Sequence, residues 1–431
     1  MAASNSRAPF LTYLTVFKAR LGAANVVLGM TDFGYVPEVT LLRKLRAVLA
    51  ERVAVEVDAP ANMPVFQYLL DKKILGAAPR DGGRYPGVTL SIADGKPRWA
   101  DRRCQPSRVA EVYRPDVWMA SSDLPSTVGV PTPENANEMR ELCVQLGLLS
   151  KAKCSWTAAG QLAHGLRRRQ AALWGADENP LLLGLESVAL LRQILAVDGL
   201  VIRELLATIT KPEGATIRRD EVALRLPVVA AAALQQARVL GRPSPEIAEG
   251  KKFVELLVQT AQKRAGASRA PGVLEHRTAP RLEWLTDLGA LGKDDMPRNG
   301  FEYVVRPDAS RLLDALPAGE DPAAVADEGA LAYWQTAESY AGLRARVPSL
   351  PVDRALLEGY RLMARSVGPT SIRDVCFAAG VLLAGERVRH ADLVARLVAL
   401  AAEVGGVTLS GGRYTRSPEM VHMADSVLAA P

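Results

Sequence analysis

The stretch WLTDLGALGKDDMPRNGFEYVVRPDASRLL, residues 284–313, decides how this sequence is interpreted. Its apolar, helix-like beginning ends at Gly289, and glycine supplies the left-handed conformation of a helix C-cap. A charged loop follows, then a run containing Phe301 and Tyr303, and then a new helix start at 307–316. Two short strands around a charged turn predict a β-hairpin, which needs a helix to pack against.

The same order of elements returns three times elsewhere in the chain. Residues 138–166 have an apolar helix ending at Gly147, a lysine-bearing loop, a strand with Trp156 and a restarted helix. Residues 65–92 and 393–428 also run from a helix through glycine and a short loop into a strand. The repetition predicts one kind of unit used several times, and the alternative is four unrelated helix–loop–strand segments.

This order of helix, glycine, polar loop and aromatic strand resembles the second half of a winged helix-turn-helix. The resemblance implies a mainly α chain with small β-hairpins, built from several winged-helix-like units in tandem joined by helices. The expected domains are an N-terminal winged-helix-like domain (1–120), a second unit with apolar helices (121–210), a basic helical linker region with a third unit (211–330) and a C-terminal helical, winged-helix-like domain (331–431).

Other segments have local signals for helices or loops. Helices are expected where apolar residues recur on one face, at 37–53, 180–209 and 371–385. The segment 180–209 is expected to form either one long kinked helix or two helices. Ser371 and Asp374 form a pair like a capping box at the start of the third. Long loops are expected where Gly, Pro and charged residues gather, at 241–250, 265–272 and 317–329.

Composition limits the class of protein. The 431 residues are 48% hydrophobic and 23% charged, which is enough apolar content for packed cores. The purest apolar run, 226–234, is about half the length that crosses a bilayer, and the N-terminus lacks the pattern of a signal peptide. We therefore expect a cytoplasmic protein with no membrane partner.

Motifs for catalysis or cofactor binding are absent from the sequence. It contains no phosphate-binding GxxxxGK[ST] loop, no GxGxxG, no HExxH and no GxSxG. The four cysteines and four histidines lack the spacing of metal ligands, so we expect buried thiols, no metal and no cofactor. Asp294 and Asp295 are a carboxylate pair, interpreted as a solvated loop tip. We therefore expect no enzymatic activity.

The charge balance permits an anionic partner. The net charge is +6, and most of the excess lies between Lys211 and Arg277, where twelve Lys/Arg face seven Asp/Glu. The helices that would serve as recognition helices, however, carry nearly balanced or acidic charge, at 65–76, 134–147, 277–289 and 389–406. Base readout needs basic or amide side chains, so these helices do not favour it.

The loops and flanking segments are more basic than those helices. The residues expected to contact nucleic acid are Arg167, Arg168, Arg169, Arg218, Arg219, Lys251, Lys252, Arg413, Tyr414 and Arg416. Arginine and lysine neutralise phosphates, so such contacts would be to the backbone and largely independent of sequence. The alternative for each cluster is a solvated helix face.

Two functions follow from the resemblance. The first is non-enzymatic binding of double-stranded DNA, in a subunit of a bacterial DNA-handling or antiviral defence complex. The second is a scaffold subunit whose winged helices mediate protein–protein assembly. Exposed Trp284 and Val144 would suit the second function, although the more ordinary interpretation of Trp284 is a core residue.

Overall fold

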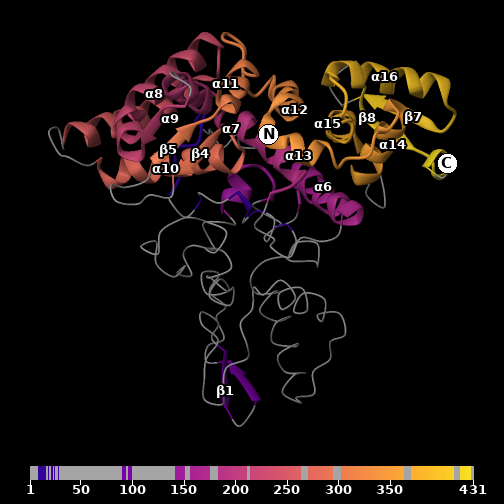
Figure 1. The fold of residues 1–431 in the computed structure, drawn as a ribbon, viewed down its shortest axis with the longest axis horizontal. Helices are drawn as coiled ribbons and strands as arrows, with labels where there is room; N and C mark the ends of the chain where they lie inside the picture. Colours follow the sequence, from indigo (N-terminus) through magenta and orange to yellow (C-terminus); the bar gives the residue numbers. More distant parts are fainter. Residues whose placement is uncertain are drawn as a thin grey trace. The chain divides into compact units, whose positions relative to one another are not determined.

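The structure is a computed structural model, and contacts divide the chain into two compact units. Unit 1 comprises residues 1–19, 161–175 and 184–431, and unit 2 comprises residues 20–160 and 176–183. The residues that the structure describes are 8–15, 18, 21–22, 24, 28, 90–93, 96–99, 141–150, 156–174, 183–210, 214–263, 270–294, 302–363, 370–411 and 418–428. Figure 1 shows the fold. The four-domain division stays a prediction.

The central winged unit, residues 216–305 of unit 1, contains the opening stretch of sequence. Its elements are β3 (Thr216–Arg218), α8 (Arg219–Val239), α9 (Ser244–Gln262), α10 (Gly272–Asp287), β4 (Leu291–Asp294) and β5 (Glu302–Val305). The strands form an antiparallel sheet in the order β3-β5-β4, with Tyr303 of β5 opposite both Ile217 and Lys293. The strand that precedes the helices therefore pairs with the second strand of the hairpin.

The C-terminal winged unit, residues 352–428 of unit 1, has the same plan. Its elements are α14 (Val352–Met363), β6 (Thr370–Ser371), α15 (Ile372–Leu382), α16 (His390–Glu403), β7 (Val407–Gly411), β8 (Pro418–Met423) and α17 (Asp425–Leu428). The sheet order is β6-β8-β7, so the first strand again pairs with the last. The predicted cap is present, since the Ser371 hydroxyl accepts a hydrogen bond from the Asp374 N–H at 3.3 Å.

Helix, strand, two helices and a hairpin, with the first strand against the third, is the arrangement of a winged helix. The C-terminal unit follows it directly; in the central unit the strand β3 is followed by three helices, and the helix that precedes β3 in the chain is the connecting helix α7. Helices take up 67% of the described residues, so the predicted fold class, mainly α with small antiparallel sheets, is confirmed. The predicted unit at 65–92 lies largely outside the described residues, and of the one at 134–166 residues 141–150 and 156–166 are described.

The remaining helices of unit 1 connect the two winged units. They are α6 (Ala158–Trp174, from Gln161 on), α7 (Glu186–Ile209), α11 (Pro307–Asp314), α12 (Ala326–Thr336), the 3-10 turn η4 (Glu338–Tyr340) and α13 (Ala341–Arg344). The predicted apolar segment 180–209 forms the single helix α7, which packs against α8 and α12. Because α12 also packs against α15, these two helices join the winged units through one core (Figure 1).

Glycines follow the helices where the repeated order of helix, glycine, loop and strand predicted them. Gly147 and Gly289 follow helix ends with φ of 73° and 82°, the left-handed region that glycine adopts without a steric penalty. Gly406, with φ of 95°, lies in the turn after Val404, the extended residue that follows α16. The leucines after the first two glycines, Leu149 and Leu291, are buried, so the chain turns back onto its own helix. The repeated order of helix, glycine, loop and strand therefore predicts where these helices end.

Unit 2 is described in short pieces. The strands β1 (Leu90–Ala93) and β2 (Lys96–Trp99) form an antiparallel hairpin, where a strand was predicted after a Gly-rich loop. In the 138–166 segment, the expected strand pairing is a single bridge between Leu149 and Trp156. The Trp156 indole N–H donates to the Leu28 carbonyl at 3.1 Å.

Two predicted loops are partly helical. The expected loop 241–250 ends early, because α9 begins at Ser244 with a proline in its first turn, where the missing N–H has no cost. The expected loop 317–329 gives way to α12 at Ala326. The segment predicted as a helix at 37–53 lies outside the described residues. None of the helices in the described ranges is both long and apolar enough to cross a bilayer.

Candidate nucleic-acid interface

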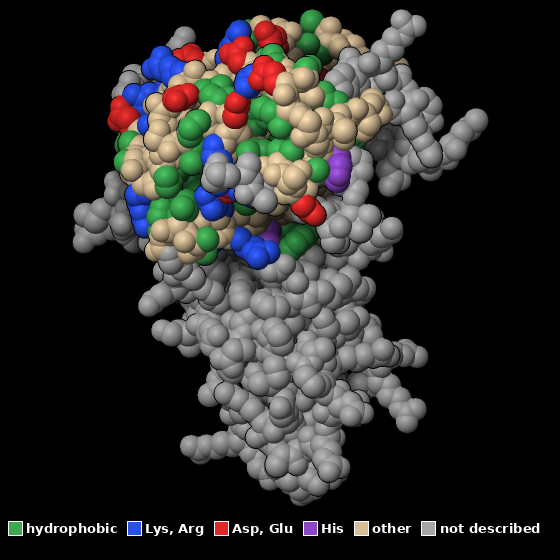
Figure 2. Space-filling model, turned by 90° about the vertical axis from the view of Figure 1, so that its right-hand side faces the viewer, with side chains coloured by type: hydrophobic (Ala, Val, Ile, Leu, Met, Phe, Trp, Pro, Cys, Tyr) green, Lys and Arg blue, Asp and Glu red, His purple; other side chains and the backbone are tan. Residues whose placement is uncertain are grey.

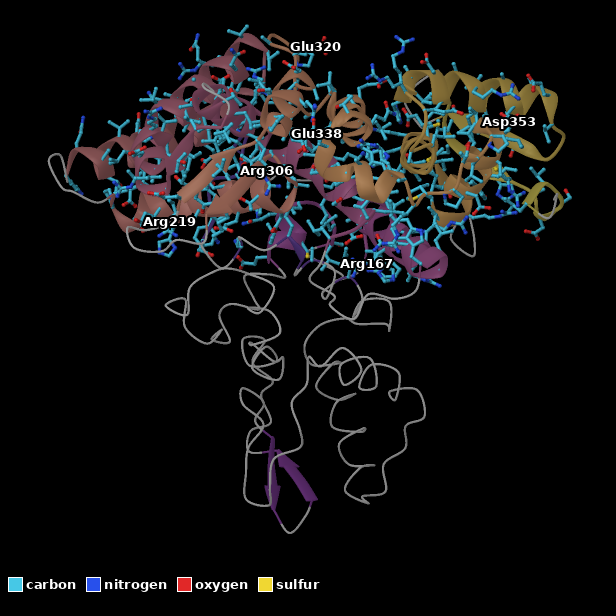
Figure 3. All side chains as sticks on the ribbon, viewed as in Figure 1. Arg167, Arg219, Arg306, Glu320, Glu338 and Asp353 are labelled. Atoms are coloured by element: carbon cyan, nitrogen blue, oxygen red, sulfur yellow. The ribbon has the colours of Figure 1, made fainter. Side chains whose placement is uncertain are left out.

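The three arginines predicted as one contact cluster on α6 point to different surroundings. Arg167 contacts the fully buried carboxylate of Glu186 at 3.0 Å, and Arg169 lies 3.4 Å from Glu358 of α14. Of these three arginines only Arg168 is exposed, and it forms no ion pair with a described residue. Figure 3 labels Arg167 on α6. The structure therefore does not bring these arginines together as one phosphate-binding face.

The arginines at the start of α8 also lie beside carboxylates. Arg218 is 3.9 Å from Asp220 of α8, and Arg219 is 3.9 Å from Glu275 of α10 (Figure 3 labels Arg219). Both arginines lie at the positive end of the helix dipole, where a cation gains nothing from the helix. The Arg219–Glu275 contact connects the first and third helices of the central winged unit.

The lysines of α9 are exposed, as predicted, but they belong to a face of mixed charge. Lys252 lies 2.8 Å from Glu249, and Lys251 lies 3.8 Å from Glu255. Such surface pairs are weak and leave the lysines mobile. Because α9 carries two lysines against three glutamates, the helix has no cationic excess to offer a phosphate backbone.

The helix before the hairpin of the central winged unit is a core helix. In α10, Arg281, Leu282, Trp284 and their neighbours are buried, and exposure is confined to the first turns. The Trp284 side chain is completely enclosed, and its indole N–H donates to the Lys18 carbonyl at 2.8 Å. The interpretation of Trp284 as a core residue is confirmed. Only the N-terminal turns of this helix are left to contact a DNA groove.

The hairpin of the central winged unit is held to α10 by a buried polar cluster. The Tyr303 hydroxyl donates to Glu283 at 2.7 Å, and the Lys293 ammonium lies 3.2 Å from the same carboxylate. Burial, and then the charge of Glu283, raise the pKa of Tyr303 well above its usual value. The lysine of the predicted polar loop thus faces the interior. The Asp294 side chain and Asp295 lie outside the described residues.

The equivalent helix of the C-terminal winged unit, α16, has an exposed face, but its arginines are paired. Arg396 forms two hydrogen bonds of 2.6 Å with Asp353 of α14 and contacts Glu403 at 2.9 Å (Figure 3 labels Asp353). The Arg396 hydrogen bonds, and its charge, lower the pKa of Asp353 below its usual value. Arg389 contacts Asp392 at 2.7 Å.

The outward residues of α16 between these pairs are small and apolar. They are Ala391, Ala395, Val398 and Ala402. Figure 2 looks at the side of unit 1 that carries this winged unit, and there acidic and basic side chains are interspersed among apolar ones. Sequence readout in the major groove uses amide or guanidinium donors, and the guanidinium groups at this helix, Arg389 and Arg396, are paired with carboxylates.

The three predicted contact residues of the C-terminal hairpin fall in its loop. Arg413, Tyr414 and Arg416 lie between β7, which ends at Gly411, and β8, which begins at Pro418. Residues 412–417 are outside the described residues, so their contacts stay predictions. By sequence position these residues connect the two strands of the β7–β8 hairpin.

A buried charge network that the sequence analysis missed joins the connecting helices α7 and α12 to α15 of the C-terminal winged unit. Arg192 of α7 donates to Asp327 of α12 and, at 2.6 Å, to Asp374 of α15, and Arg373 also contacts Asp327. Burial acts to raise the pKa of Asp327, but Arg192 and its neighbours outweigh that effect and lower it. One signal was present in the sequence, because Arg192 interrupts an apolar helix and needs a buried partner.

A second buried pair fixes the N-terminal segment of unit 1. Arg281 of α10 donates to both carboxylate oxygens of Asp198 of α7, at 2.6 and 2.8 Å, and both side chains are completely buried. The same guanidinium donates to the Leu11 carbonyl at 2.7 Å, and Asp198 accepts the Leu11 N–H at 2.9 Å. Residues 8–15 are therefore held against the core by this pair.

Potential metal ligands are not grouped in the described ranges, and the two cysteines there are buried. Within these ranges, no three His, Cys, Asp or Glu side chains lie close enough to hold a metal ion. Cys143 and Cys376 are buried free thiols, and burial raises the pKa of each to about 12, which disfavours the reactive thiolate.

Comparison with known proteins gives no family for this chain. No family model, no curated protein and no solved structure matches it.

Of the seven described residues expected to contact nucleic acid, six lie within 4 Å of a carboxylate, with Arg168 as the exception. The function is therefore inferred from the charges and the exposed faces of the winged units.

Proposed function

We propose that the chain is a non-enzymatic scaffold subunit whose winged-helix units mediate protein–protein assembly. The observation that carries the proposal is the outward face of α8 in the central winged unit. On this one helix, Leu224, Val228 and Val239 expose 48%, 73% and 73% of their surface to solvent. Single exposed aliphatic residues are ordinary, but a row of them along one helix is typical of a surface that binds protein.

The inner face of α8 shows that this exposure is a property of the fold. Val222, Leu226, Val229 and their neighbours pack against α7, α9 and α10, which fixes the orientation of the helix. The exposed residues therefore cannot turn inward without opening the core. Val228 and Leu224 stay in water until a partner covers them, and covering one aliphatic side chain contributes about 1.5–3 kcal/mol.

The charges support assembly over readout of DNA by the recognition helices. The α10 helix is enclosed, and the arginines of α16 are engaged by Asp353, Asp392 and Glu403. A partner protein needs neither free cations nor amide donors at these helices. The resemblance to winged-helix proteins leads us to propose a bacterial DNA-handling or defence complex as the setting.

Photo-crosslinking from α8 tests the assembly function. A benzophenone amino acid is placed at Val228 and, as a matched control, at Lys251, which is also exposed but lies on the charged face of α9. We expect protein adducts from position 228 in cells that express the full chain, and few from position 251. Equal yields from both positions, or none from position 228, would contradict the proposal.

Direct binding of double-stranded DNA is the second candidate, carried by the loop of the C-terminal hairpin. The described residues of 352–428 hold six arginines against eight acidic residues, so the cations proposed to meet a phosphate backbone are Arg413 and Arg416 of the loop. Together with Tyr414 they lie where a wing contacts the backbone in a winged helix. Such contact would be electrostatic and independent of base sequence.

A salt titration measures this candidate. The fluorescence anisotropy of a labelled duplex is followed with the full chain from about 50 to 200 mM salt, since each phosphate contact adds close to 0.9 to the logarithmic slope. If the wing binds DNA, replacing Arg413 and Arg416 by Ala lowers the slope by about two contacts. Absence of binding at about 50 mM salt excludes the candidate.

A further inference from the structure

Beside the exposed residues Arg225 and Val239, six exposed residues of α8 follow a palindromic spacing. They are Glu221, Leu224, Val228, Ala231, Gln235 and Arg238, all exposed, at alternating intervals of three and four residues. This spacing forms the seam along which two helices pack at a shallow crossing angle. Read from either end of the helix, the intervals are the same, so the seam is complementary in geometry to an antiparallel copy of itself.

Aligning two copies of α8 in antiparallel fashion gives complementary layers. With the two-fold axis at the midpoint between Val229 and Ala230, Val228 of one copy faces Ala231 of the other. Leu224 faces Gln235 in the next layer on each side. The outermost layers place Glu221 opposite Arg238, which makes two ion pairs of opposite charge across the axis.

We propose that α8 docks on α8 of a second copy of this chain, in an antiparallel, two-fold symmetric dimer. The proposal rests on the assembly function above and names its partner. Charge selects the orientation, because a parallel alignment in the same register would place Glu221 against Glu221 and Arg238 against Arg238. Both residues are exposed, and in the described part of the chain neither has a carboxylate or cationic partner within 4 Å.

The size of the seam sets the strength of the dimer. Stable complexes bury about 800 Å² on each partner, and six residues of one helix face supply less than that. Interfaces below this size are weak or transient, so we expect a dissociation constant between about 10 µM and 1 mM. At cellular concentrations such a contact serves chains that are already brought together by other parts of an assembly.

A charge exchange between two variants tests the partner and the orientation together. Glu221→Arg places two arginines in each outer layer of its own dimer, and Arg238→Glu places two glutamates there. Mixed, the two variants regain both opposite-charge pairs. Both substitutions are at exposed positions, and circular dichroism confirms that each variant is folded.

Sedimentation velocity between about 1 µM and 1 mM measures the result. We expect the unaltered chain to dimerise, each variant alone to dimerise at least 10-fold more weakly, and the equimolar mixture to return to within about 3-fold of the unaltered chain. A chain that stays monomeric to 1 mM, variants that dimerise like the unaltered chain, or a mixture without recovery would overturn the proposal.

The crosslinker at Val228 separates this proposal from the broader assembly function. An adduct with twice the mass of the chain supports self-docking. An adduct only with a different protein overturns self-docking and leaves the assembly function in place. No protein adduct overturns both.

Discussion

The buried pair of Asp198 and Arg281 gives a quantitative test of the fold that carries these surfaces. In Arg281→Met the aspartate keeps only the Leu11 N–H and loses two hydrogen bonds of 2.6 and 2.8 Å, while the side chain stays fully buried. The Leu11 and Arg277 carbonyls lose their guanidinium donor as well. Removing one member of a buried ion pair costs about 3–5 kcal/mol, so we expect a loss of about 4 kcal/mol.

Urea unfolding followed by circular dichroism and tryptophan fluorescence measures this loss in the free energy of unfolding. The double variant Asp198→Leu, Arg281→Met removes both charges, and it should recover more than half of the loss because no buried charge is left unpaired. Arg389→Met is the control, since Arg389 and Asp392 form an exposed pair that contributes little. A loss below about 1 kcal/mol in Arg281→Met, or no recovery in the double variant, would refute the reasoning.

The loss in Arg281→Met should also depend on pH in a defined direction. Burial raises the pKa of Asp198 above 3.8, and Arg281 opposes that rise. Without the guanidinium the pKa rises further, and an acid whose folded pKa is raised gains stability as pH falls and it takes up a proton. The deficit relative to the unaltered chain should therefore be smaller at about pH 5 than at about pH 8. An equal deficit at both values would mean that Asp198 is not the buried charge that loses its partner.

Three further predictions concern local features of unit 1. Gly289→Ala should destabilise the chain by at least about 2 kcal/mol, because φ is +82° and a new Cβ would lie 2.2 Å from the Cβ of Ser339. Gly319→Ala, at φ +87° in open space, should lose only the free energy of the backbone strain, and thermal unfolding of both variants measures the difference. The pKa of Asp327 is lowered from 3.8, so its contribution to stability is present above that pH and is lost as pH falls below it; unfolding free energies from pH 7 to 3 should fall more steeply below about pH 4 in the unaltered chain than in Asp327→Asn. Ser371→Ala should cost about 1 kcal/mol of the same free energy by removing the N-cap of α15, and an unchanged value would show that this cap does not contribute.

Local chemistry explains why the repeated order of helix, glycine, loop and strand could be predicted. A glycine after the last helical turn has a backbone requirement that the sequence itself displays, and Gly147 and Gly289 meet it, whereas Gly406 takes its positive φ in the turn after α16. Buried leucines after the first two follow from the same local pattern. For this reason the helix ends of segments that lie far apart in the chain could be compared from the amino-acid sequence alone.

The strands that complete each sheet could not be predicted. β3 has three residues and β6 has two, and each pairs with a strand about 50 or more residues further along the chain. Strands of that length have no periodicity to detect, and their pairing depends on how the helices between them pack. The closure of each hairpin into a three-stranded winged-helix sheet is therefore visible only in the structure.

The candidate site was harder to predict than the fold because charge counts ignore pairing. Arg169 meets Glu358 and Arg219 meets Glu275, partners 189 and 56 residues away in sequence. Counting cations along the chain treats such arginines as free. The exposed aliphatic row on α8 was present in the sequence, but 226–234 was considered there only as an apolar run, and which of its residues face outward depends on the packing of the helix.

Sedimentation velocity of the unaltered chain together with a labelled DNA duplex tests the central claim most directly. The protein is varied from about 1 µM to 1 mM at about 50 mM salt, and protein and duplex are detected separately. We predict that the protein sediments faster as its concentration rises, while the duplex sediments at its own rate. A duplex that sediments with a protein that shows no self-association would overturn self-docking and would favour the DNA-binding candidate over the assembly function.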